Sequence, residues 1–309
     1  MKKHNGLRAG LLLLVVAALR VLTVTGTDAA ESRAVALHED KPAVWVLHCL
    51  PPAEKAPVQP AAFSPEEAEG IAVGGRCSYT PKIADLLTAP CPVTPGEGPQ
   101  VLIVHTHTSE AYTQTVGWTY AESDPLRTTQ ADRSVVQVGR ELADALEAQG
   151  ISCLHDESLN DFPDYNGAYG RSLGKVKDWL AQYPSIAVVL DVHRDAIADG
   201  NGEWLSENVG LNGEKCARVM LVVGTDEGGA EHPDWEDNLN FAVKVQAAVR
   251  RSYPALCKPI DLRRERFNQH LLPGSLLVEI GSAGNTLPEA LTAAQAFGTA
   301  LGAYLHGLM

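Results

Sequence analysis

The stretch IAVVLDVHRD occupies residues 186–195, where an apolar run leads directly into charged and imidazole side chains. A continuous apolar run of this length is typical of a strand that is buried on both faces of a parallel sheet. Charged groups next to a core are costly unless they are paired or bind a ligand. The stretch therefore predicts a central strand over 186–192, with Asp191 and His193 at its carboxyl end as members of a candidate site.

The residues around this strand, from about 98 onward, alternate between short apolar runs and amphipathic segments. Further strands are predicted at 101–104, 151–154, 219–224 and 275–280. Helices are predicted at 134–148, 173–183, 238–253 and 287–305, from the spacing of their apolar residues and from their end signals. The alternation predicts an α/β fold with a mostly parallel sheet flanked by helices.

The N-terminus has the sequence pattern expected of an export signal. Lys2, Lys3 and Arg8 precede an apolar stretch over residues 9–24, which Arg20 interrupts. Because positive flanks stay in the cytoplasm, residues 1–26 are expected to be a transmembrane anchor or a signal segment. Both fates fit the small residues at 25–30, so we expect either a single-pass protein of the cell membrane with an extracytoplasmic catalytic domain, or a secreted one.

The next part of the chain, residues 27–97, is rich in Pro and Ala. Such a composition extends rather than packs, and it is expected to form an extracytoplasmic linker. Residues 98–309 would then form the catalytic domain.

Overall composition excludes two classes of function. The net charge of −13 argues against nucleic acid as a partner, because affinity for nucleic acid comes largely from Lys and Arg. The 6 cysteines form no Cys-x-x-Cys pair, so their spacing supports no zinc ribbon or thioredoxin-like motif.

The first strand, at 101–104, runs into HTHTSE at residues 105–110. His107 and Glu110 are separated by three positions, which can bring an imidazole and a carboxylate to one point. This pair suits zinc, which binds neutral imidazole and carboxylate and keeps one position for water in catalytic sites. His193 would be the third ligand, and Asp191 would accept its second N–H or cap a loop.

A carboxylate also lies in the apolar strand at 275–280. Beside a metal, Glu279 would be placed to take a proton from bound water and pass it to a leaving amine. The alternative is a buried salt bridge to Arg194 or Arg266.

The chain resembles the stage II sporulation protein P family. Five motifs carry this resemblance: HTHTSEAY at 105–112, DVHRDA at 191–196, HPDWEDNLNFA at 232–242, RFNQ at 266–269 and LVEIGSAGNTL at 277–287. Their number and order make it specific over about residues 100–305. The family is similar in its catalytic domain to zinc-dependent N-acetylmuramoyl-L-alanine amidases and, more distantly, to zinc carboxypeptidases.

The resemblance implies an N-terminal membrane anchor, peptidoglycan as the substrate and degradation of the septal cell wall during sporulation engulfment. It also implies a lytic transglycosylase partner, stage II sporulation protein D. By resemblance, Zn²⁺ would be held by His107, Glu110 and His193, with Glu279 as the proton-transfer residue. Related amidases take their acidic ligand from the start of the first helix, which makes Asp132 the alternative to Glu110.

Further site residues are expected near these groups. Arg194, Asn268 and Asn285 are candidates for gripping the peptide or stabilising the oxyanion, and His105 is a candidate substrate or supporting group. Tyr165, Asn166 and Arg171 are expected mainly to order the loop after the second strand. Two other functions fit the same sequence: a zinc endopeptidase or carboxypeptidase on stem peptides, and a non-catalytic, membrane-anchored wall-binding scaffold.

Overall fold

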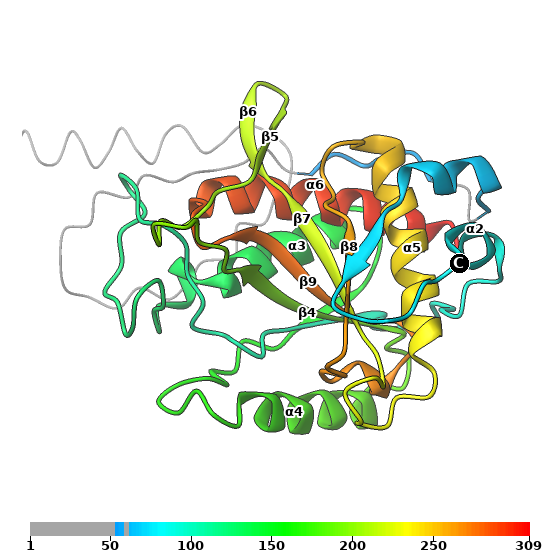
Figure 1. Ribbon diagram of the computed structural model, residues 1–309, viewed down its shortest axis with the longest axis horizontal. Helices are drawn as coiled ribbons and strands as arrows, with labels where there is room; N and C mark the ends of the chain where they lie inside the picture. The colour runs from blue at the N-terminus through cyan, green and yellow to red at the C-terminus, as the bar shows by residue number, and fades with distance from the viewer. Residues whose placement is uncertain (1–52, 59–61) are drawn as a thin grey trace, which may run out of the picture. The chain divides into compact units, whose positions relative to one another are not determined.

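A single large sheet organises the part of the chain that the computed structural model describes, residues 53–58 and 62–309. Within these residues the sheet has seven strands in the order β1-β8-β7-β9-β4-β2-β3 (Figure 1). All neighbouring strands pair in parallel except β7 and β9. The strands are β1 (Val73–Gly75), β2 (Val101–Val104), β3 (Cys153–His155), β4 (Val188–Asp195), β7 (Val219–Gly224), β8 (Ile260–Arg263) and β9 (Ser275–Ser282).

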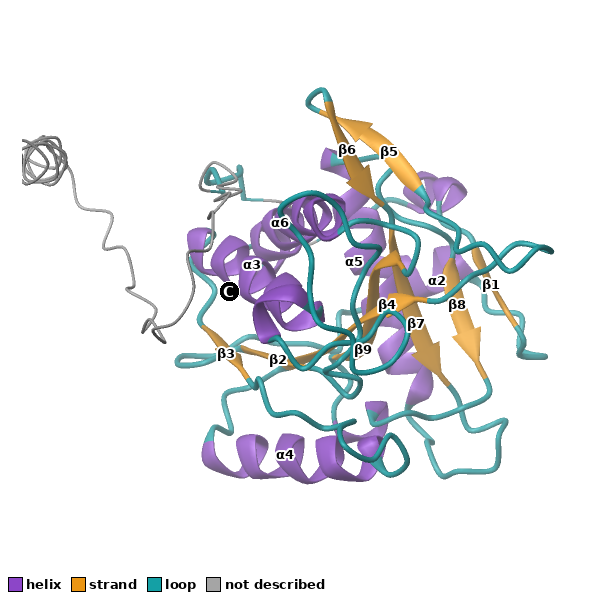
Figure 2. Ribbon diagram, turned by 90° about the vertical axis from the view of Figure 1, so that its left-hand side faces the viewer, coloured by secondary structure: helices purple, strands orange, loops and turns teal. Residues whose placement is uncertain are grey.

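Helices cover both faces of the sheet. In Figure 2, α4 lies below the sheet, and α3 and α6 lie above it. Residues of α5 pack with those of α6 in the large core. The predicted α/β fold with a mostly parallel, helix-flanked sheet is confirmed. The helices are α2 (Ile83–Thr88), α3 (Val135–Ala148), α4 (Ala168–Gln182), α5 (Trp235–Ser252) and α6 (Leu287–His306), with short 3-10 helices η1 (Pro65–Gly70), η2 (Ala131–Arg133) and η3 (Gln269–Leu271).

The alternation of side chains along each strand decides which residues meet above and below the sheet. On β4, Leu190 and Val192 belong to the large core under α3 and α6, whereas Val189 packs on the α4 side. The side-chain period of a strand is two, so His193 is expected on the α4 side with Val189. On β9, Val278 belongs to the large core, which by the same rule places Glu279 on the α4 side.

The helix boundaries follow local hydrogen bonds. α3 begins after Ser134, whose side chain accepts a hydrogen bond from the N–H of Val136. α6 begins with a capping box, in which Thr286 and Glu289 satisfy each other's backbone groups. α5 starts at Trp235, three residues before the expected position.

The expected linker contributes to the fold. β1 forms an edge of the sheet by pairing with β8. α2 is held on α5 by Lys244, whose ammonium donates to the carbonyls of Leu87 (2.5 Å) and Ala89 (2.7 Å) near the end of α2. Prolines break long periodicity in this region, but short apolar patches still reach the core.

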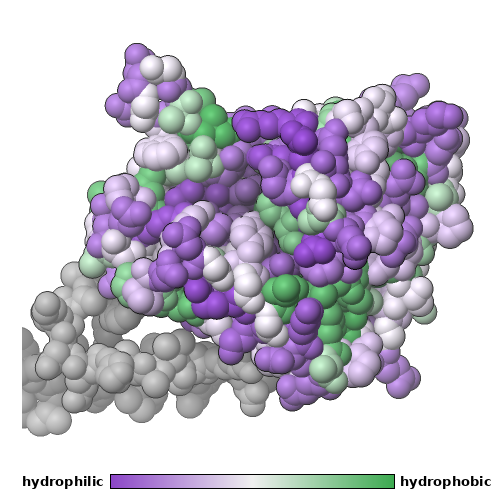
Figure 3. All heavy atoms as spheres, turned by 60° about the horizontal axis from the view of Figure 1, so that its bottom comes forward, coloured by the Kyte–Doolittle hydropathy of each residue, from purple (hydrophilic) through white to green (hydrophobic). Residues whose placement is uncertain are grey.

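Two other features were not expected. The hairpin of β5 (Asn208–Leu211) and β6 (Glu214–Ala217) projects from the sheet (Figure 1). The other is β8, whose sequence IDLR alternates apolar and polar residues and lacks the continuous apolar run that marks β2. Within the described residues, no helix has both the length and the apolar character to cross a membrane. The predicted anchor, residues 1–26, lies outside them. The face turned toward α4 is mostly hydrophilic, with apolar patches between polar areas (Figure 3).

One helix residue makes stability depend on pH. Burial, followed by the nearby Asp144, raises the pKa of Glu141 in α3 to about 7. The folded state therefore resists ionisation of this carboxyl, and stability should fall as pH rises from about 4.5 through 7. We predict that Glu141→Gln raises the free energy of unfolding by about 2 kcal/mol at pH 8 and by much less at pH 4.5. Urea unfolding at both pH values measures this difference.

The matched control is Glu147→Gln, because Glu147 lies on the same helix and is exposed. It should change stability equally at both pH values. A Glu141→Gln effect that does not depend on pH would contradict the prediction.

Candidate active site

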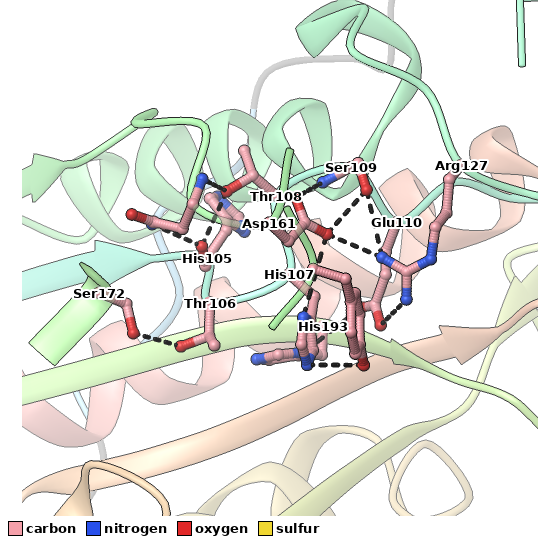
Figure 4. A network of polar contacts seen from close by, with 12 residues as sticks. His105, Thr106, His107, Thr108, Ser109, Glu110, Arg127, Asp161, Ser172 and His193 are labelled. Carbon is pink, nitrogen blue, oxygen red and sulfur yellow. Dashed lines mark hydrogen bonds and ion pairs between the residues drawn. The ribbon is translucent and has the colours of Figure 1, made fainter. Parts of the chain in front are cut away.

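The candidate site lies at the carboxyl ends of three neighbouring parallel strands, β2, β4 and β9. His193 on β4 stands directly opposite Glu279 on β9 in the strand register. His107 and Glu110 follow the end of β2, and Figure 4 shows them beside His193. Ligands commonly collect at this edge of a parallel sheet. The fold therefore brings together the four residues that were predicted from separate motifs.

His193 is buried between two carboxylates. Its Nδ1 lies 3.3 Å from Glu110 Oε2, and its Nε2 lies 2.9 Å from Asp191 Oδ1. Burial disfavours the charged imidazole, but Asp191 and Glu110 together hold the pKa of His193 well above its usual value. Burial would likewise raise the pKa of Glu110, but contact with His193 and the charge of Arg194 lower it to about 2. Asp191 thus contacts the second nitrogen of His193, and it also caps the loop after β2 by accepting hydrogen bonds from the backbone N–H and the hydroxyl of Thr106, so both expectations for this carboxylate apply.

His107 faces the same space from the other side. The centroids of the His107 and His193 rings are 5.3 Å apart, and the ring planes are nearly perpendicular. His107 Nε2 lies 3.1 Å from the Tyr165 hydroxyl, whereas its Nδ1 is buried and has no hydrogen bond. That Nδ1 is 3.9 Å from a carboxylate oxygen of Asp161. Burial lowers the pKa of His107, against the opposing charge of Glu110.

Two residues that the sequence motifs did not indicate support this arrangement (Figure 4). Asp161 accepts hydrogen bonds from the backbone and side chain of Ser109 and pairs with Arg127 at 2.7 Å. The Arg127 guanidinium also lies 3.6 Å from Glu110. Asp161 follows β3, whose carboxyl end lies at the same edge of the sheet. This position in the sequence could have indicated Asp161 as a site residue, because neighbouring parallel strands have their carboxyl ends at the same edge of the sheet.

Glu279 is a buried carboxyl with an unusual proton affinity. Burial raises its pKa to about 8, the charge of His193 opposes this shift, and Glu110 and Asp195 add to it. Its Oε2 has no hydrogen-bond partner. The carboxyl therefore keeps a proton near neutral pH in this environment, unlike an ordinary glutamate.

The chemistry of this group fits a divalent metal ion of the zinc type. Zinc binds imidazole nitrogen and carboxylate oxygen, which His107, His193 and Glu110 supply. Buried polar atoms without partners, such as His107 Nδ1 and Glu279 Oε2, are uncommon in proteins and call for an explanation such as an ion. Among residues 53–58 and 62–309, however, no three His, Cys, Asp or Glu side chains converge as a ready-made metal site.

His105 lies on the opposite side of the strand from this site. Its Nδ1 is 2.9 Å from the Val192 carbonyl, and its Nε2 is 2.8 Å from Nε2 of His155. Burial is the main cause that lowers the pKa of His105 to about 3 and of His155 to about 4, so both rings are neutral at pH 7. His105 has no exposed surface, which leaves none for a substrate.

The other expected substrate contacts are engaged within the protein. Arg194 donates to the carbonyls of Ala111 and Leu126, and Asn268 donates to Tyr169 and Ser172. Asn285 is fully buried and bonds to Asn208, Glu289 and Ser282, which shapes the turn before α6.

The two carboxylates considered as the acidic ligand have different surroundings. Asp132 is half exposed and pairs with Arg133. Glu110 contacts His193 directly.

Comparison with known proteins identifies the family. The sequence profile described as stage II sporulation protein P matches residues 59–302. The chain belongs to the stage II sporulation protein P family. This confirms the resemblance drawn from the five motifs, and the match begins well before residue 98, in agreement with the contribution of β1 and α2 to the fold.

A relative is the stage II sporulation protein P of Bacillus subtilis (strain 168). It is 29% identical over 218 residues, which cover 66% of this chain and 50% of that protein. The chain therefore spans about half the length of the curated relative it matches.

Several solved structures of amidases are similar at low identity. They include N-acetylmuramoyl-L-alanine amidase AmiC2 of Nostoc punctiforme (14% identity, 68% of this chain and 97% of that one, TM-score 0.37). Another is the CwlD amidase from Clostridioides difficile in complex with the GerS lipoprotein (12%, 67% and 95%, TM-score 0.38). A third is Ami1 from Mycobacterium abscessus (11%, 68% and 98%, TM-score 0.39). At these TM-scores the similarity adds nothing to the fold described above.

The His105–His155 pair requires a glycine on α3. A Cβ on Gly139 would lie 2.6 Å from Nε2 of both rings. We predict that Gly139→Ala lowers the free energy of unfolding by about 1–3 kcal/mol, because the pair must shift in a closely packed interior. Thermal or urea unfolding of the purified protein measures this loss.

Gly174→Ala provides the matched control, since Gly174 lies on α4 and a Cβ there would meet nothing within 4 Å. It should raise stability by up to about 1 kcal/mol through helix propensity. Equal effects of the two substitutions would contradict the packing role of Gly139.

Proposed function

We propose that this chain is a zinc-dependent peptidoglycan hydrolase that cleaves the amide bond between the glycan strand and its stem peptide, an N-acetylmuramoyl-L-alanine amidase. Membership of the stage II sporulation protein P family supports a role at the cell wall during sporulation. The single observation that carries the proposed chemistry is the gathering of His107, Glu110 and His193 beside Glu279 at one edge of the sheet.

His107, Glu110 and His193 would hold the metal ion in this proposal. A bound zinc ion would supply Lewis acidity and lower the pKa of a bound water from 15.7 to about 7. Asp191 contacts Nε2 of His193, and Arg127 forms ion pairs with Glu110 and Asp161. These contacts orient the proposed ligands, and such supporting groups strongly affect metal affinity.

Glu279 is the proposed proton-transfer residue. Burial raises its pKa to about 8 without a metal ion, and a bound cation beside the carboxyl would lower this pKa, so that the group could both accept and release a proton near neutral pH. We assign it two tasks: accepting a proton from the attacking water, and delivering one to the departing amide nitrogen. Its position opposite His193 places it beside the proposed ligands.

The cellular setting is proposed from the sequence and the family. Residues 1–26 would anchor the protein, so that residues 98–309 act outside the cytoplasm on the septal wall during engulfment. The lytic transglycosylase stage II sporulation protein D is the proposed partner. The transglycosylase would cut the glycan strands, and this chain would release the stem peptides from them. The two activities together would dismantle the wall.

The deciding experiment is digestion of purified peptidoglycan, with and without a chelator, followed by mass spectrometry of the fragments. We predict lytic activity that a chelator abolishes and added Zn²⁺ restores. Glu279→Gln should lower the rate by roughly 10²–10⁴-fold, because it removes the acid–base group. His193→Ala should abolish metal binding, and circular dichroism checks that each variant is folded.

His306→Ala serves as the control, since His306 lies at the end of α6, and it should digest at the wild-type rate. Glycan strands freed of peptide would support an amidase, whereas trimmed cross-links with intact glycan–peptide bonds would indicate an endopeptidase. Absence of bound metal together with unchanged wall binding in all variants would mean a non-catalytic scaffold and would overturn the proposal.

A further inference from the structure

Large apolar side chains that are exposed to solvent concentrate at the edge of the sheet where the candidate site lies. Within residues 53–58 and 62–309, nine such side chains are exposed. Six of them lie on the segments that follow β2, β3 and β4, whose carboxyl ends meet at this edge. They are Val116, Leu159, Phe162, Tyr165, Trp204 and Leu205. Such a concentration commonly marks a surface that binds a ligand or a partner.

Trp204 belongs to a short hairpin that follows β4 directly. It pairs with Ala198 as an antiparallel bridge. Asp199 closes the turn between them by accepting a hydrogen bond from the N–H of Glu203 at 2.9 Å. The backbone around Trp204 is therefore fixed, although its side chain is 46% exposed.

This hairpin is attached to the turn that follows β9, the strand of Glu279. The Ser282 hydroxyl donates to the carbonyl of Leu205. A Cβ on Gly284 would lie 2.5 Å from the carbonyl oxygen of Trp204, so the two backbones are in contact there. Ser282 comes three residues after Glu279, which corresponds to about 10 Å along a strand. Trp204 therefore lies beside the candidate site, on the side of β9.

Phe162 lies on the other side of the site, in the loop that follows β3. Its neighbour Asp161 has a carboxylate oxygen 3.9 Å from Nδ1 of His107. Arg171 on α4 donates to backbone carbonyls on both sides of Phe162, which orders this loop as expected. The Phe162 side chain is nevertheless 44% exposed.

The third exposed aromatic residue at this edge, Tyr165, has a ring that is already engaged. It stacks on His107 with centroids 4.6 Å apart, and the Arg127 guanidinium lies 4.8 Å from its centroid. Within the described part of the chain, neither another ring nor a cation lies over Phe162 or Trp204. These two rings are therefore available to a ligand.

The charges of the two loops disfavour an anionic membrane as the ligand. Residues 156–166 contain four acidic residues, and residues 196–207 contain three. Neither stretch contains Lys or Arg, which attract a protein to anionic lipids. Sugar rings carry no charge, and a pyranose has an apolar C–H face that packs on an aromatic ring.

The positions of Phe162 and Trp204 also favour the substrate over a protein partner. A protein that covered both rings would close off the candidate site between them. In the proposed reaction, the bond that is cut joins a peptide to a sugar. One sugar must then lie at the site, and its neighbours along the glycan strand must lie on either side of it.

We propose that Phe162 and Trp204 are contact points for the glycan strand, with each ring packing against the apolar face of a sugar beside the one that carries the peptide. The inference rests on the proposed function for its choice of ligand. It deepens that function by naming the residues that hold the sugar part of the substrate. The strand would run along the edge of the sheet, from the loop after β3 to the turn after β9.

The test is binding of an oligomer of β-1,4-linked N-acetylglucosamine to the purified full chain, measured by isothermal titration calorimetry. This probe is uncharged and carries no stem peptide, so binding is measured without the proposed cleavage. Trp204→Ala and Phe162→Ala should each weaken binding by roughly tenfold, the effect of losing contact with about 50 Å² of apolar surface. The two effects should add in the double variant, because the rings lie on opposite sides of the site.

Two conservative variants separate ring packing from general apolar contact. Trp204→Phe keeps an aromatic ring and should retain part of the affinity, whereas Trp204→Leu should bind as weakly as Trp204→Ala. The melting temperatures of these variants should match that of the wild type, because the side chain is exposed. Tyr79→Ala is the matched control, since Tyr79 is 41% exposed and follows β1, whose carboxyl end points away from the site. It should bind the oligomer like the wild type.

The outcomes separate this inference from the proposed function. Absence of binding by the wild type, or unchanged binding in both alanine variants, overturns the inference and leaves the digestion of peptidoglycan to decide the function. Unchanged oligomer binding together with lost binding to phosphatidylglycerol vesicles would assign the two rings to a membrane and also overturn it. Weakened oligomer binding in a chain that digests no peptidoglycan would support the glycan contacts while the proposed function fails.

Discussion

A buried imidazole between two buried carboxylates is the interaction on which the candidate site depends. His193 contacts Glu110 at 3.3 Å and Asp191 at 2.9 Å, and all three side chains are largely removed from water. Buried charges are costly unless each has partners, so removing one of the three leaves the others uncompensated. Because Glu110 follows β2 and Asp191 lies on β4, this cluster also joins two strands at the edge where the site forms.

The supporting groups reach this cluster from loops that follow neighbouring strands. Asp161 and Tyr165 come after β3, and Arg127 comes from the excursion between β2 and α3. Arg127 contacts Asp161, Glu110 and the ring of Tyr165, so one guanidinium connects both loops. The site is thus built on rigid strand ends and is surrounded by loops whose positions are set by a few charged contacts.

The remaining strands support the site indirectly. β1, β8 and β7 run antiparallel to β9 and its parallel neighbours, so their carboxyl ends point away from the site. The motif at 232–242 lies at the start of α5. Asn238 there donates to the carbonyl of Leu272, before β9, and to that of Ser275, the first residue of β9. This motif therefore fixes the entry to the strand that carries Glu279, outside the group of candidate site residues.

The sequence by itself determined the α/β fold and most of the strands and helices, and it singled out His107, Glu110, His193 and Glu279 as candidate site residues, because these signals are local. Apolar runs reveal buried strands, and polar groups at their ends stand out against them. The alternation of side chains along a strand also indicates where His105 lies. It comes two residues after Ile103 of the large core, so its side chain points to the same face and is buried under α3. Tertiary structure alone decided that Asp161, Arg127 and Tyr165 belong to the site and that residues 73–75 join the sheet. Such contacts join segments far apart in the chain, and only the packing of the strands brings those segments together.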